Sequence, residues 1–412
     1  MSIEKERNTV TKIAKNICNL CSKGEMTEVL RFNNLSLGFL TNINERVWNN
    51  DYVLDKCQEC SYIQTRKNLP EELLIKENYY VSKYQAILEH DLLFAEDIVK
   101  RTNLAYHDGI LEIGSGDGSL LNNFFNNGFK NLMGVEPITH KDKNIAIEII
   151  PEFFSEKTLE IINKKKFNAK LVYANYVIEL IEDTNKFFKL VHSLLQPRSF
   201  LYFEVPYLPA FIRNLRYDCF AHLRCNFITA KSVFYLSQKI GFEVELIEAD
   251  KAYRGGMLKV LLSKKVKSSS IENPINSQLR ELIKEEDLCL YENMTKDFLR
   301  HKEKAEALIS KKAKDFSLIV FYGAGVKAAT LFNILSLNKF NIDYAIDNDS
   351  NKQGLYFSGT NIRVYPLSKL FSESKNCLVI NFALDHTKEI TNLLASNCKA
   401  PYEIIDLFNG SV

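Results

Sequence analysis

The sequence lacks the features that mark membrane, secreted and nucleic-acid-binding proteins. Its 53 basic and 51 acidic residues give a net charge of +2, so no excess charge favours nucleic acid or an anionic membrane surface. No apolar run approaches the ~18 residues of a membrane span. The charged stretch 1–17 lacks the apolar core of a secretory signal. These absences predict a cytoplasmic protein that binds neither membranes nor nucleic acid.

Glycine and proline are also scarce, with 16 and 9 residues in 412, and there is no low-complexity tract. The remaining composition, 46% hydrophobic and 25% charged, is typical of a globular protein. The chain is longer than the ~250–300 residues of a single core, which predicts several domains. The composition gives no indication of the oligomeric state.

Short apolar segments alternate with helical ones, which predicts βαβ units and mostly parallel sheets. The predicted strands are "GILEIG", "NLMGVEP", "AKLVYANY", "SFLYFEVP", "FEVELIEA", "MLKVLLSKK" and, after Ser317, "LIVFYGAG", "IDYAIDND", "CLVINFA" and "PYEIIDLF". Helical spacing predicts a linking helix at about 80–104 and a charged helix at roughly 278–314. The polar stretch 265–277 predicts a linker. The α/β chain therefore divides into residues 1–75, 76–265, 266–316 (linker and helix) and 317–412.

Four of the nine cysteines form two CxxC pairs, Cys18 with Cys21 and Cys57 with Cys60. Disulfides are unusual in a reducing cytosol, so metal binding is the favoured use of these pairs. Two such turns supply a tetrahedral S4 site suited to Zn²⁺, and four protein ligands leave no position for substrate. We therefore expect a structural zinc, with a loop that includes Trp48 between the pairs; a redox pair or plain core cysteines are the alternatives.

A first glycine-rich turn, "ILEIGSGDGSLL", places Gly114, Gly116 and Gly118 between a predicted strand and a predicted helix. Such a turn lets a nucleotide-like ligand approach the backbone at a helix N-terminus. The spacing is GxGxG rather than the dinucleotide GxGxxG, and Glu112 precedes it. Both features favour S-adenosylmethionine (SAM) over NAD. Glu136 in "GVEP" is expected to accept hydrogen bonds from the ribose hydroxyls.

Asn175 ends the strand that would border the methyl group of SAM. The alternative is that the glycines serve only strand-to-helix packing. A second turn, "FYGAGVKAATLF", with Asp347 twenty-two residues after Gly325, also resembles a mononucleotide-binding half-fold. Lys327 in this turn is either a phosphate ligand or an exposed lysine at a helix start.

The order of these parts resembles the three-domain sugar C-methyltransferases, which act on nucleotide-linked ketosugars. The resemblance covers nearly the whole chain and implies an N-terminal zinc module, a central class I methyltransferase domain with a Rossmann-like fold, and a C-terminal Rossmann-like domain that helps build the sugar-nucleotide cleft. "YYVSKY" is similar to the family's substrate-side stretch, which implies that Tyr79, Ser82 and Tyr84 bind substrate. "EFFSE" is similar to the family's cofactor domain and implies that Phe154 lies at SAM.

The segment "YDCFAHLRCNFIT" departs from the family pattern. Leu180 stands where the family has a histidine, and Ala221, Leu223 and Arg224 replace a tyrosine, a glutamate and a histidine. C-methylation beside a carbonyl needs a base and a donor to the enolate oxygen. The loss of these side chains therefore predicts a changed acceptor.

Tyr217, Asp218 and His222 remain as candidates on this segment. We expect His222 to act as the base and Arg224 to hold an acidic group of the acceptor, because an extended backbone would put both on one side. Tyr217 is a possible helper. The alternative is a histidine bonded to nearby backbone.

These observations predict a SAM-dependent methyltransferase for a small anionic acceptor, nucleotide- or sugar-linked, methylated on C, O, N or S. A catalytically inactive SAM- or nucleotide-binding relative that works through partners is the second hypothesis. A nucleotide-dependent oxidoreductase is the third.

Overall fold

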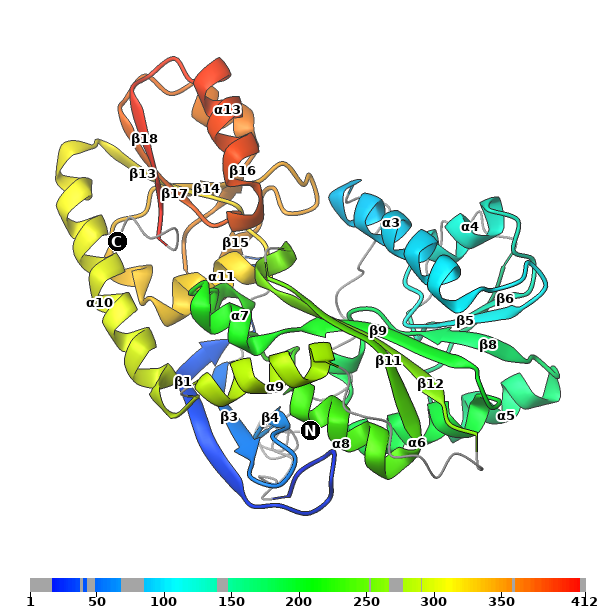
Figure 1. Ribbon diagram of the computed structural model, residues 1–412. Coiled ribbons are helices and arrows are strands. Elements are labelled where there is room, and N and C mark those ends of the chain that lie inside the picture. Colours follow the sequence, from blue (N-terminus) through cyan, green and yellow to red (C-terminus); the bar gives the residue numbers. More distant parts are fainter. Residues whose placement is uncertain are drawn as a thin grey trace, which may run out of the picture.

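The computed structural model describes residues 17–37, 40–42, 49–67, 85–138, 147–251, 253–266, 277–289, 291–357 and 360–407. Trp48 and the predicted substrate residues Tyr79, Ser82 and Tyr84 lie outside the described residues. The described residues form three larger sheets and one two-stranded sheet, and α10 runs from the N-terminal sheet to the C-terminal domain (Figure 1). In the part of the chain described, no helix is long and apolar enough to cross a membrane.

The N-terminal sheet is antiparallel and has the strand order β1-β3-β4-β10. Its strands are β1 (Met26–Ser36), β3 (Asn49–Cys57), β4 (Ile63–Thr65) and β10 (Asn226–Phe227). The last strand comes from the segment that follows His222, so this sheet includes residues from the middle of the chain. A further short strand, β2 (Leu40–Thr41), pairs with β15 (Tyr356–Phe357) of the C-terminal domain. Both pairings join the N-terminal part to the rest of the molecule.

The central sheet has seven strands in the order β11-β12-β9-β8-β5-β6-β7. Strand β12 runs antiparallel between β9 and β11, while the remaining neighbours are parallel. This mixed sheet confirms the predicted Rossmann-like methyltransferase fold. Its strands are β5 (Gly109–Ile113), β6 (Leu132–Val135), β7 (Glu148–Ile150), β8 (Ala169–Tyr173), β9 (Phe200–Pro206), β11 (Phe242–Asp250) and β12 (Met257–Lys264).

Helices cover both faces of the central sheet (Figure 1). One face packs on α3 (Gln85–Thr102) and α4 (Ser119–Asn126). The other face packs on α6 (Thr184–Leu194), α8 (Ala230–Ile240) and α9 (Ser277–Leu288). Both faces are therefore buried, which explains why strands such as β8 and β9 are apolar almost throughout. The remaining helices of this half are α5 (Glu156–Lys164) and α7 (Leu208–Arg213).

The C-terminal domain has a parallel five-stranded sheet with the order β16-β14-β13-β17-β18. The strands are β13 (Leu318–Tyr322), β14 (Tyr344–Ile346), β16 (Val364–Tyr365), β17 (Cys377–Asn381) and β18 (Tyr402–Asp406). Its helices are α11 (Val326–Ile334), α12 (Leu367–Phe371) and α13 (Thr387–Asn397). The prediction of a single charged helix at roughly 278–314 is wrong, because this stretch forms two helices, α9 and α10 (Met294–Lys312). One apolar core runs without interruption from β1 through α10 to β13, so the terminal parts share a core.

Candidate active site and metal centre

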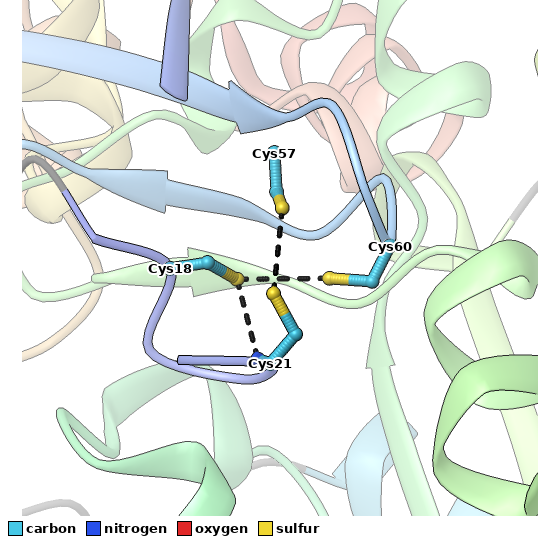
Figure 2. Close-up of side chains that lie close together, drawn as sticks. All are labelled: Cys18, Cys21, Cys57 and Cys60. Atoms are coloured by element: carbon cyan, nitrogen blue, oxygen red, sulfur yellow. Dashed lines mark hydrogen bonds between the residues drawn. The ribbon is translucent and has the colours of Figure 1, made fainter. Parts of the chain in front are cut away.

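The four paired cysteines lie together in the folded chain (Figure 2). Their sulfur atoms all lie within 4.8 Å of one another, and all four residues are buried. Cys18 Sγ lies 3.6 Å from Cys60 Sγ, and Cys21 Sγ lies 3.6 Å from Cys57 Sγ. Four sulfurs held ~2.3 Å from a tetrahedral Zn²⁺ would be about 3.8 Å apart. The cluster therefore has the donor type and the spacing of a metal site.

The first CxxC turn is closed by backbone N–H groups that donate to sulfur. The N–H groups of Leu20 and Cys21 lie 3.4 and 3.5 Å from Cys18 Sγ. Gly24 follows this turn with a φ of +79°, and a Cβ added there would lie 2.5 Å from Cys57 Sγ. Only glycine fits this position without displacing the Cys57 sulfur.

The cysteine cluster is anchored on the methyltransferase domain. The backbone N–H of Asn185, at the start of α6, donates to the carbonyl of Asn19 at 3.1 Å, and its side chain donates to the carbonyl of Leu20. The hydroxyl groups of Tyr62 and Thr184 are also hydrogen-bonded to each other. The helix that follows the loop after β8 is thus held by the first cysteine turn.

The first glycine turn joins β5 to α4, as predicted. Gly114 and Gly116 have φ values of +75° and +51°, and a Cβ on Gly114 would lie 2.1 Å from a methyl carbon of Val177. The carboxylate of Glu136, which follows β6, accepts hydrogen bonds from the N–H groups of Gly116 and Ile138, both at 2.9 Å. Each carboxylate oxygen keeps a further lone pair. The structure therefore brings these predicted cofactor residues together, with Gly118 at the N-terminus of α4.

Buried polar atoms without partners lie at the same edge of the sheet. Among the described residues, neither polar atom of the Asn175 side chain has a hydrogen-bond partner, and neither does Ser115 Oγ. Leaving such a group unpaired costs about 1–3 kcal/mol. A polar ligand at the carboxyl ends of β5 and β8 would satisfy them, so these residues fit SAM. When bound, SAM supplies an electrophilic methyl group.

The two other predicted cofactor residues flank this region. Burial raises the pKa of Glu112, on β5, well above its ordinary value, although the nearby Tyr173 hydroxyl opposes the shift. The protonated form of this carboxyl is therefore favoured. Phe154 is partly buried and packs edge-on against Phe187 of α6, with 5.7 Å between ring centroids. Neither contact shows a ligand, so both roles stay predictions.

The backbone between Ala221 and Arg224 is not extended, so the geometric premise for a shared His222 and Arg224 site is wrong. Residues 222 and 223 form a turn, and the N–H of Arg224 donates to the carbonyl of Ala221 at 2.9 Å. A turn of this kind reverses the chain and removes the alternation of side chains that an extended strand would give. The predicted helper Tyr217 is buried and packs edge-on against Phe298 of α10.

His222 faces the N-terminal sheet. Its Nε2 atom lies 2.9 Å from the carbonyl oxygen of Leu35, and its ring packs edge-on against Tyr52. Burial lowers the pKa of His222 to about 4, although hydrogen bonding to the backbone opposes the shift. These contacts match the alternative reading of a histidine bonded to backbone.

Arg224 also has intramolecular partners. Its guanidinium donates to the carbonyl of Cys219 at 2.5 Å. Burial raises the pKa of Glu179, and the nearby Arg224 guanidinium opposes this shift. Leu180, the next residue, is exposed. It stands where the resembling family has a histidine, so the side chain at that position is apolar.

Lys327 belongs to an ion cluster between the methyltransferase and C-terminal domains. Its ammonium lies 2.7 Å from Asp385 and 3.8 Å from Asp218. Arg216 donates to both oxygens of Asp218, at 2.7 and 2.8 Å, and to Asp385 at 2.7 Å. Burial would raise the pKa of Asp385, but the two cations hold it well below its usual range. The structure thus pairs the predicted phosphate ligand Lys327 with carboxylates.

The second glycine turn repeats the arrangement of the first. The N–H of Ala324 donates to the Asp347 carboxylate at 2.8 Å, as Gly116 does to Glu136. The ammonium of Lys352 donates to the same carboxylate at 3.2 Å.

A buried polar cluster that the sequence reasoning missed joins α3 to β9. His90 Nε2 lies 3.0 and 3.2 Å from the two carboxylate oxygens of Glu204, which is fully buried. The Tyr176 hydroxyl donates to the same carboxylate at 2.9 Å. The His90 ring stacks on Tyr253, with 3.7 Å between centroids. The sequence signal for this cluster was a glutamate inside an otherwise apolar strand, since a charge there needs a partner.

Two family descriptions match successive parts of the chain. Residues 81–247 match a methyltransferase domain, and residues 252–405 match the C-methyltransferase C-terminal domain. The C-methyltransferase NovU of Streptomyces niveus is 24% identical over 366 residues, which cover 84% of this chain and 85% of NovU.

Solved methyltransferase structures are also similar. A SAM-dependent methyltransferase from Archaeoglobus fulgidus is 12% identical, covering 42% of this chain and 94% of its own, with a TM-score of 0.32. The glycopeptide N-methyltransferase MtfA complexed with SAM has the same identity and coverage and a TM-score of 0.31. TM-scores this low carry no weight for the activity of the chain, which is indicated by the two matched domains. With a match to a methyltransferase domain followed by a match to the C-methyltransferase C-terminal domain, this chain is a SAM-dependent methyltransferase.

Proposed function

We propose that the protein transfers the methyl group of SAM to a carbon next to a carbonyl group in a small, sugar- or nucleotide-linked acceptor. The observation that carries the proposal is the coexistence of two glycine turns, each with an acidic partner, in one chain. Glu136 and Asn175 suit SAM, while the turn at Ala324 and Asp347 suits a second nucleotide-like group. The match to a C-methyltransferase C-terminal domain favours carbon as the atom methylated.

The cofactor half of the proposal depends on the chain's own residues. Glu136 binds the ribose hydroxyls of SAM through its remaining lone pairs. Asn175 binds a polar group of SAM and holds the cofactor at the carboxyl end of β8. A structural Zn²⁺ bound by Cys18, Cys21, Cys57 and Cys60 supports the loop between β8 and α6 through Asn185.

The residues around the acceptor differ from those of the usual family members. Leu180, Ala221 and Leu223 cannot transfer protons, so the base must come from elsewhere in the site. An acceptor hydroxyl or amine would need less help from a base, and methylation of oxygen or nitrogen is the competing outcome.

The test uses the full-length protein, methyl-¹³C SAM and a panel of nucleoside diphosphate ketosugars and their reduced hydroxyl counterparts. Mass spectrometry detects transfer, and the ¹³C chemical shift of the new methyl group distinguishes carbon from oxygen or nitrogen. We expect transfer to a ketosugar with a new carbon–carbon bond. Transfer to the hydroxyl counterparts alone would contradict the proposal. Tight SAM binding with no transfer to any member would instead favour an inactive relative.

A further inference from the structure

The His90 cluster lies at the carboxyl ends of the central strands, where ligands bind in open α/β sheets. Glu204 is near the end of β9, and Tyr176 directly follows Asn175 at the end of β8. Tyr176 adopts a φ of +56°, which is uncommon for a residue other than glycine. The backbone N–H of Tyr176 donates to the Glu204 carbonyl at 3.1 Å. The cluster is therefore built onto the residues next to the predicted methyl position.

The geometry of the pair determines which nitrogen of His90 can act. Both side-chain oxygens of Glu204 face Nε2, where they can accept a hydrogen bond from an Nε2–H group. Nε2 must therefore carry the proton, which leaves the lone pair of the neutral ring on Nδ1. The part of the chain that the structure describes gives Nδ1 no hydrogen-bond partner, and the side chain is 14% exposed.

We infer that His90 is the base of the reaction, with Glu204 and Tyr176 as positioning residues; this inference rests on the proposed function. Nδ1 of His90 takes the proton from the acceptor carbon beside the carbonyl. The electron pair of the broken C–H bond forms an enolate, which attacks the methyl carbon of SAM. A carbon–carbon bond forms, the carbon–sulfur bond breaks, and S-adenosylhomocysteine leaves as a neutral thioether. The imidazolium, stabilised by Glu204, then returns its proton to solvent.

This assignment accounts for the substitutions elsewhere in the site. A histidine held by a carboxylate supplies the base that Leu180 and Leu223 cannot supply. The Tyr176 hydroxyl, by donating to Glu204, fixes the carboxylate that orients the ring. A cluster with a merely structural role would hold α3 on the sheet but would not affect proton transfer.

The first test needs no acceptor. Protein labelled with ¹⁵N-histidine is examined by NMR at pH 7, and His90 is assigned by its loss in His90→Asn. We expect a neutral ring protonated on Nε2, and a loss of that tautomer preference in Glu204→Gln. A proton on Nδ1 at pH 7 would overturn the inference.

The second test separates deprotonation from methyl transfer. The ketosugar that the parent enzyme methylates is incubated in D₂O with S-adenosylhomocysteine, and deuterium entry beside the carbonyl is followed by NMR. We expect His90→Asn to slow exchange and methylation by ~10²-fold or more, with SAM affinity by calorimetry unchanged. The exposed His107→Asn is the control and should match the parent.

The outcomes are distinguishable. If the parent methylates only oxygen or nitrogen, the proposed function fails, and the role of His90 as a carbon base fails with it. If the parent methylates carbon and His90→Asn exchanges as fast as the parent, the inference alone is wrong. A His90→Asn protein that loses SAM affinity and stability together would assign the cluster to scaffolding.

Discussion

At the scale of single residues, Glu136 links the glycine turn to the proposed cofactor. Glu136→Ala removes the acceptor for the N–H groups of Gly116 and Ile138 and for the ribose hydroxyls. Hydrogen bonds to a charged group contribute roughly 1.5–3 kcal/mol each, so calorimetry should show SAM affinity at least tenfold weaker. Glu148→Ala, an exposed carboxylate on β7, is the control. Equal affinities in all three proteins would place SAM elsewhere.

His222 gives a residue-scale prediction about pH. Its pKa is about 4 in the folded protein, against ~6.5 for a free histidine. The unfolded chain therefore binds the proton more tightly, so stability present above pH 6.5 is lost as the pH falls towards 4, by about 3 kcal/mol.

The measurement for His222 compares the parent with His222→Gln. The glutamine amide can keep the hydrogen bond to the Leu35 carbonyl but does not titrate. Urea titrations give the free energy of unfolding at pH 7 and at pH 4.5. The decrease in this free energy from pH 7 to pH 4.5 should be smaller for the variant than for the parent. Other titrating groups are common to both proteins, so equal falls would mean that His222 does not titrate in this range.

At the scale of elements, the turn after Cys21 offers a matched pair of glycines. Gly24 and Gly354 both have positive φ, +79° and +91°, but only a Cβ on Gly24 would meet the sulfur of a cysteine in the cluster. A left-handed alanine costs about 1–2 kcal/mol at either site. We expect Gly24→Ala also to speed metal release to a chromogenic chelator, while Gly354→Ala should release metal like the parent. Identical release rates would show that the turn tolerates a displaced Cys57 sulfur.

The elements also show how far the sequence could predict the site. The cysteine pairs and the glycine turns are local in sequence, so their spacing alone predicted where their members meet. His90, Glu204 and Tyr176 come from a helix, a strand and a loop, and although Glu204 in an apolar strand implies a partner, no local pattern says which residue that partner is. The backbone of the segment 217–229 is set by packing against the N-terminal sheet, which no local pattern records.

At the scale of the whole molecule, the cluster of Arg216, Asp218, Lys327 and Asp385 joins two domains. Asp385→Asn would leave two cations with one carboxylate, and the side chain of Arg216 is 10% exposed. Because Asp385 is partly exposed, we expect a loss of about 1–3 kcal/mol in unfolding free energy rather than the larger cost of a fully buried pair.

Hydrogen exchange should locate the effect of Asp385→Asn. Protection should fall at residues 253–255 and 384–386, the two short turns that meet at this boundary. The control is Asp297→Asn, which removes an exposed ion pair with Arg300 on α10. It should change the free energy of unfolding by no more than ~1 kcal/mol and should leave the protection of both turns as in the parent. A uniform loss of protection would mean that the cluster supports the whole fold rather than the boundary.

The pairing of β2 with β15 has a consequence for the order in which the molecule is made. Leu40 and Thr41 emerge from the ribosome early but find their partners only at Phe357 and Tyr356, more than 300 residues later. β1, β3 and β4 can pair at once, whereas β10 and β15 arrive with the middle and the end of the chain. At ~5–20 residues per second, the gap between the synthesis of β2 and that of β15 lasts tens of seconds. The pairing of β2 is therefore completed only after all strands of the N-terminal and central sheets have been synthesised.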